Sequence, residues 1–170
     1  MPSQKLKYLE YEDFLILLFA VVSEQYRRGK NEPLPDYSKE DSDDLRKVLE
    51  HSKNDTYYPK VIDKAAYIFT SIVCGHIYSN GNKRLALIAM VFFLMINGYH
   101  LPSLKGGELK DLAIYVADSK ANKNISFEGK KAYVKNFLLT RMRRKYKHAK
   151  AIQKVLNVFK GLIGSHKKTT

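Results

Sequence analysis

The sequence contains a single cysteine among its 170 residues. One cysteine cannot form an internal disulfide, and it cannot supply the several thiolates of a structural zinc site. Cys74 lies within an apolar stretch, which is typical of a buried thiol in a reducing compartment. Because cysteine cross-links are excluded, the fold must depend on a hydrophobic core, and apolar residue types make up 45% of the chain.

Long apolar runs are also missing. The longest uninterrupted run, Leu85–Ile96, has twelve residues, whereas a membrane-spanning helix needs about 20. A second run, Phe14–Val22, lies near the N-terminus, but Glu10 and Glu12 precede it where a signal peptide would be basic. We therefore expect both runs to form core helices of a cytoplasmic protein without a membrane span.

Acidic residues are absent from the C-terminal part of the chain. Residues 141–170 hold ten lysines and arginines and no acidic residue, whereas residues 1–140 hold 20 basic and 17 acidic residues. We expect a nearly balanced domain over residues 1–140 and a basic helical extension over 141–170. Such an extension can pack on the body, or bind an acidic protein, a nucleic acid or a membrane surface, and its charge alone does not choose among these.

Apolar residues recur at three- and four-residue spacing along most of the sequence, which predicts amphipathic helices. No segment alternates long enough for a large sheet, so the expected class is all-α, with at most one small hairpin. Pro59 suits the first position of a helix, and Asn97-Gly98 suits a helix end. The expected helices are Phe14–Arg28, Ser38–His51, Pro59–Cys74, Asn82–Ile96, Leu109–Asp118, Lys130–Arg141 and Ala149–Ile163.

The nine residues from His76 to Arg84 are polar, although they separate the two most apolar segments of the chain. Gly81 and Asn82 lead into a helix whose first N–H groups have no partner within the helix, and such a terminus binds anions. Lys83 and Arg84 fall in the first turn, where cations oppose the helix dipole unless a phosphate neutralises them. A histidine beside a phosphate site predicts transfer of a phosphorus-containing group to a hydroxyl. The structural alternative is a capped loop with a buried histidine and two surface cations.

The same residues resemble the motif of the Fic/Doc family, His-x-Phe-x-Asp/Glu-Gly/Ala-Asn-Gly/Lys-Arg. His76, Gly81, Asn82 and Arg84 match it. Lys83 matches the Doc (death-on-curing) variant, whereas adenylyl-transferring Fic proteins have glycine there. Leu87 stands where those proteins have a second arginine. The flanking segments also resemble Doc-type surroundings, and the resemblance covers roughly residues 10–140. These segments are Tyr58-Pro59, Lys64-Ala65-Ala66 and Asn97-Gly98-Tyr99.

The resemblance implies a Fic-fold helical bundle with a small β-hairpin flap. His76 would be the general base, and Asn82 would form the anion hole with the N–H groups of Gly81–Lys83. Lys83 and Arg84 would bind nucleotide phosphates, and Tyr78 would anchor the loop in the core. Residues 53–58 would form the flap, which clamps a target chain by strand addition. The expected flap contacts are Asn54, Asp55, Thr56, Tyr57 and Tyr58.

For a Doc-like member, the resemblance implies a toxin kinase. It would transfer the γ-phosphate of ATP to a target protein such as elongation factor Tu, with Mg²⁺ as cofactor and an antitoxin chain as inhibitor. Asn80 stands where the family holds Mg²⁺ with an acidic residue. An amide oxygen can bind this ion, but it lacks the negative charge of a carboxylate. Two alternatives therefore stay open: an AMP transferase, and a catalytically weak Fic-fold binding module.

Overall fold

The fold was analysed in a computed structural model, which describes residues 5–12, 14–15, 43–78, 81–102, 107–118 and 124–144. Most of the helix expected at Phe14–Arg28 and all of the helix expected at Ala149–Ile163 lie outside these residues. The same is true of Asn80, the candidate metal ligand.

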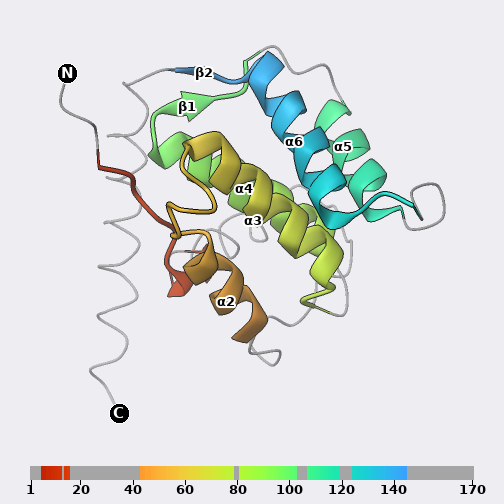
Figure 1. The fold of residues 1–170 in the computed structure, drawn as a ribbon, viewed down its shortest axis with the longest axis horizontal. Coiled ribbons are helices and arrows are strands. Elements are labelled where there is room, and N and C mark those ends of the chain that lie inside the picture. The colour runs from red at the N-terminus through yellow and green to blue at the C-terminus, as the bar shows by residue number, and fades with distance from the viewer. Residues whose placement is uncertain are drawn as a thin grey trace, which may run out of the picture.

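The described residues form a helical bundle with one small antiparallel strand pair, which confirms the expected fold class (Figure 1). Helices α3 and α4 pack side by side through the centre, α5 and α6 lie together on one side of them, and α2 packs against α3 (Figure 1). The elements are α2 (Asp43–His51), α3 (Val61–Gly75), α4 (Asn82–Ile96), β1 (Tyr99–His100), α5 (Glu108–Ala117), α6 (Phe127–Arg141) and β2 (Arg143–Arg144).

Helix α4 has the bounds that its apolar pattern predicts. Side chains on several sides of it are buried, including Leu85, Met90 and Phe93. The helix ends at Asn97 and Gly98, and Gly98 has a φ of 83°, which glycine adopts without a steric penalty. The Asn97 side chain also accepts from Lys7 N at 2.9 Å and donates to Lys7 O at 2.9 Å. This helix end therefore holds the N-terminal segment against the bundle.

The starts of α3 and α6 differ from the expectation because local capping decides them. Helix α3 begins at Val61, after Pro59, and the Asp63 carboxylate accepts from the backbone N–H of Lys60 at 3.2 Å. Helix α6 begins at Phe127, three residues before the predicted Lys130, because the Ser126 hydroxyl accepts from Gly129 N at 3.1 Å.

The strand pair does not lie in residues 53–58, so the expectation of a β-hairpin there is wrong. Tyr99 pairs with Arg144, and His100 with Arg143. In the expected flap, the Asn54 side-chain oxygen accepts from the N–H groups of Thr56 and Tyr57 at 2.9 and 3.2 Å, and Tyr58 N donates to Asn54 O at 3.0 Å. These local bonds use the N–H groups that a strand ladder would need.

Residues 141–144, the first part of the expected extension, contact the bundle. Arg141 closes α6 and its Nη2 lies 2.6 Å from a carboxylate oxygen of Glu108, while Arg143 and Arg144 form β2. The remainder of the extension, from residue 145, lies outside the described residues. Among the helices that the structure describes, none has the length and apolar character to cross a membrane.

Candidate functional site

The link between α3 and α4 begins with an uncommon backbone conformation. His76 caps the C-terminus of α3 with φ 47° and ψ 43°, and it is the one non-glycine residue with a positive φ in the described part of the chain. A left-handed conformation costs a residue with a Cβ about 1–2 kcal/mol. Residues held in such conformations cluster at functional sites. The exposed side chain of His76 therefore marks this turn as a candidate site.

Asn82 fixes the far end of the same link. Its Oδ1 accepts from Tyr78 N at 2.9 Å, and its Nδ2 donates to Tyr78 O at 2.6 Å. The Tyr78 side chain is only 2% exposed, so this amide pair joins the α4 N-terminus to a residue held in the core. Asparagine suits the position because one short side chain supplies both a donor and an acceptor.

The N-terminus of α4 has two features that favour an anion. Gly81 is its N-cap with φ 78°, and glycine has no side chain that could cap the first N–H groups. Lys83 is exposed and Arg84 is half-buried, both in the first turn. The first turn contains no acidic residue, although negative charge is what the helix dipole favours there. A phosphate group would satisfy the N–H groups and both cations together.

A cleft of about 700 Å³ brings these residues together. His76 lies on the same cleft as the α4 N-terminus, so an imidazole and the cations Lys83 and Arg84 face one space. The opposite wall comes from α5. None of the lining residues in the described part of the chain is acidic. The lining consists of Val73, His76, Gly81, Asn82, Lys83, Arg84, Leu87, Lys110, Ala113, Ile114 and Ala117.

Lys110 is the charged lining residue that the sequence did not indicate as part of a site. It belongs to α5, outside the motif, and was expected only as part of an amphipathic helix. A signal was present, since Lys110, Ile114 and Ala117 recur at helical spacing and lie on one face. The sequence alone did not indicate which neighbour that face would meet.

A second cleft, of about 860 Å³, lies on the other side of the link, against α2 and α3. Gly75 and Ile77 line it, whereas His76 between them lines the first cleft. Asn54, from the expected flap, lines the second cleft as well. The link therefore separates a cationic cleft from one that is bordered by the flap segment.

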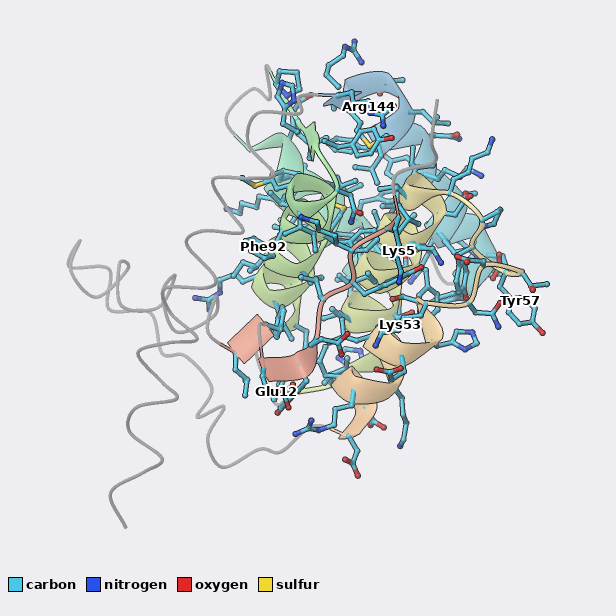
Figure 2. All side chains as sticks on the ribbon, turned by 90° about the vertical axis from the view of Figure 1, so that its left-hand side faces the viewer. Lys5, Glu12, Lys53, Tyr57, Phe92 and Arg144 are labelled. Carbon is cyan, nitrogen blue, oxygen red and sulfur yellow. The ribbon has the colours of Figure 1, made fainter. Side chains whose placement is uncertain are left out.

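The expected flap contacts have different surroundings. Tyr57 is 67% exposed and projects from the body (Figure 2), with its ring stacked on His51 at 5.9 Å. Thr56 is exposed, whereas Tyr58 is buried and stacks on Tyr67 at 4.4 Å. Burial raises the pKa of Tyr58 to about 12. Thr56 and Tyr57 can thus reach another molecule directly.

A buried lysine fastens this segment to α3. Lys64 is fully buried, and its Nζ donates to Ser52 O at 2.9 Å and lies 2.8 Å from Asp55 Oδ1. Tyr8 also donates to Asp55 Oδ1, at 3.5 Å. The hydrogen bond from Lys64 lowers the pKa of Asp55 below its ordinary value. Asn54 and Asp55 therefore have structural partners within the chain.

Mg²⁺ is the cofactor that the motif resemblance implies, and the described cleft residues do not fit it. This ion prefers carboxylate oxygens, and no acidic residue lines the described part of the cleft. The Asn82 oxygen already accepts from Tyr78 N. In the described part of the chain, no cluster of three or more His, Cys, Asp or Glu residues could hold a metal.

Fold and site together define a small helical bundle whose two central helices are joined by a link that bears a histidine and leads into a cationic cleft. Residues 11–94 match the Fic/DOC family. The match spans α2, α3, the link and α4 as far as Leu94, whereas Lys110 lies beyond it. No curated protein matches the chain.

Proposed function

We propose that this chain is a Fic/DOC-type transferase that moves the γ-phosphate of ATP to a hydroxyl group of a target protein. The family match suggests a transferase acting on proteins. The observation that carries the proposal is the shared cleft, in which His76 lies with the open α4 N-terminus and with Lys83 and Arg84.

The proposed step needs three functions from the chain. The His76 imidazole takes the proton of the target hydroxyl, and the oxygen then attacks the γ-phosphorus. The bond from that phosphorus to the β–γ bridging oxygen breaks, and ADP leaves with its electron pair. The α4 N–H groups, Lys83 and Arg84 neutralise the charge on the phosphate oxygens, which is the main contribution a protein makes to such transfers.

Lys83 and Leu87 favour a kinase over an AMP transferase. In the resemblance on which the proposal rests, lysine at position 83 accompanies γ-phosphate transfer, and glycine accompanies AMP transfer. Leu87, which lines the cleft, is uncharged, whereas the adenylyl-transferring proteins have a second arginine at this position. AMP transfer is the second candidate, because an open helix N-terminus binds an α-phosphate as readily as a γ-phosphate.

The target chain is proposed to contact the exposed Thr56 and Tyr57 and to place its hydroxyl at the exposed side chain of His76. A cytoplasmic translation factor such as elongation factor Tu is the proposed target, and an antitoxin chain the proposed inhibitor. Residues 1–140 would then form the catalytic domain, with the basic residues 141–170 as a separate surface for an acidic or nucleic-acid partner.

A non-catalytic binding module is the alternative that the lack of acidic residues in the described cleft favours.

The test uses the purified full-length chain with Mg²⁺, elongation factor Tu and a bacterial lysate. ATP carries its label on the γ-phosphate in one reaction and on the α-phosphate in another, with His76→Ala as the matched variant. We expect protein labelling from the γ-phosphate alone, lost in His76→Ala. Labelling from the α-phosphate would identify an AMP transferase. No labelling in either reaction, beside an active family member, would support the binding module.

A further inference from the structure

The cationic cleft has two walls, and only one of them belongs to the motif. Lys83 and Arg84 come from the first turn of α4, whereas Lys110 comes from α5. The same two walls also contribute the apolar residues Leu87, Ala113 and Ile114. The described part of the cleft therefore combines cations from two helices with apolar lining residues.

Unlike five other described lysines, Lys110 forms no ion pair with a carboxylate of the described residues. In the described part of the chain, Lys47, Lys53, Lys64, Lys131 and Lys135 each pair with an acidic residue, and no such pair involves Lys110. Its acidic neighbours on α5 lie elsewhere: Glu108 pairs with Arg141, and both Glu108 and Asp111 line a groove between α5 and α6. Cations that share a cleft repel one another unless an anion lies between them.

The position of Lys110 along the cleft follows from a contact at the other end of α5. Cys74 Sγ, in the last turn of α3, lies 4.0 Å from Val116 O, so the C-terminal part of α5 lies beside the link that carries His76. Lys110 precedes Val116 by six residues, which is about 9 Å along a helix axis. Leu87 likewise lies about one helical turn beyond Lys83.

We propose that Lys110 binds the phosphates of a nucleotide that lie farther from the α4 N-terminus. It would thereby supply from α5 the cation that Leu87 does not supply from α4. This inference rests on the proposed function, and it specifies the ligand as a polyphosphate. A single phosphate bound at Gly81 and Asn82 would leave Lys110 without an anionic partner in the described cleft.

The test measures binding by calorimetry, with the full-length chain and constant Mg²⁺. The probes are AMP, ADP, ATP and inorganic tripolyphosphate. We expect Lys110→Ala to weaken ATP and tripolyphosphate binding about tenfold, as for one lost charge-assisted hydrogen bond, and to leave AMP binding unchanged. Lys110→Arg should retain ATP binding. Lys5→Ala removes one exposed charge outside the described cleft and is the matched control.

Several outcomes would overturn the inference. One is that Lys110→Ala binds ATP as tightly as wild type, or loses as much affinity for AMP as for ATP. Another is that Lys5→Ala loses as much ATP affinity as Lys110→Ala. A third is that the wild-type chain binds AMP as tightly as ATP. A wild-type chain that binds no probe would overturn the inference together with the proposed function. A separate outcome is that Lys110→Ala weakens the binding of ATP and tripolyphosphate but not of AMP, while the wild-type chain transfers no label to protein. In that case the proposed function fails and the phosphate site at Lys110 stands.

Discussion

The ammonium nitrogen of Lys64 lies 2.8 Å from a carboxylate oxygen of Asp55, and the two side chains have opposite exposure. Lys64 is fully buried, whereas the Asp55 side chain is 75% exposed. The lysine extends from α3 through the core and also donates to Ser52 O. One buried cation thus fixes both ends of the short turn that precedes Thr56 and Tyr57.

Replacing Lys64 with methionine should release that turn while keeping most of the side-chain volume. The Ser52 carbonyl would lose its donor, which costs about 1–3 kcal/mol when the acceptor stays buried. We expect the free energy of unfolding to fall by that amount in a urea titration. Lys47→Met removes an exposed pair with Asp44 and should cost less than about 1 kcal/mol. Equal losses in the two variants would contradict the structural role of Lys64.

The Asp55 carboxylate should make this contact sensitive to acid. Lys64 lowers the pKa of Asp55 below its ordinary value of 3.8, so the folded state holds the ionised form more strongly than the unfolded chain does. The stabilisation is present above that ordinary value and is lost as the pH falls through the lower pKa of the folded state. We expect wild type to melt at a higher temperature than Asp55→Asn at pH 7, and this difference to shrink toward pH 3. A difference that is constant with pH would exclude this origin.

Asn82 should matter more to the site than to the fold. Asn82→Ala removes the two hydrogen bonds that join the start of α4 to Tyr78. Each such bond contributes about 0.5–1.5 kcal/mol to stability. The variant should stay folded by circular dichroism, yet bind ATP at least tenfold more weakly, because the α4 N-terminus is no longer held against the link. The matched control is Asn136→Ala, an exposed asparagine on α6, which should bind ATP as wild type does.

The sequence predicted the central helices better than the segments around them. Residues 82–96 are apolar nearly all round and are followed by Asn97-Gly98, so periodicity and cap chemistry agreed on the bounds of α4. His76, Gly81, Asn82, Lys83 and Arg84 could be grouped because they are close in sequence, and the structure places all five on one cleft. Local patterns suffice where a site is built from one short segment.

The sequence predicted less where a partner comes from a distant segment. The flap was expected as a hairpin, but the Asn54 side chain uses the N–H groups of Thr56 and Tyr57. The contact of Lys64 with Ser52 and Asp55 spans a turn, and nothing in the sequence marks Lys64 as buried. Lys110 reaches the cleft only because α5 packs beside α4. These relationships depend on tertiary packing, which helical periodicity does not encode.

Asn80, which precedes Gly81 in the sequence, gives the test that best separates an enzyme from a binding module. The described cleft residues offer cations and no carboxylate, so a neutral amide at position 80 adds little affinity for Mg²⁺. If the chain is an active kinase, Asn80→Asp should lower the Mg²⁺ concentration needed for half-maximal labelling. The measurement is γ-phosphate labelling across a Mg²⁺ titration. The double variant Asn80→Asp/His76→Ala is the control, and it should show no labelling.

An unchanged Mg²⁺ dependence in Asn80→Asp would contradict a metal-binding role for position 80. Activity in Asn80→Asp and none in wild type would instead show that the natural chain is not a Mg²⁺-dependent transferase, and that its cationic cleft serves to bind phosphates.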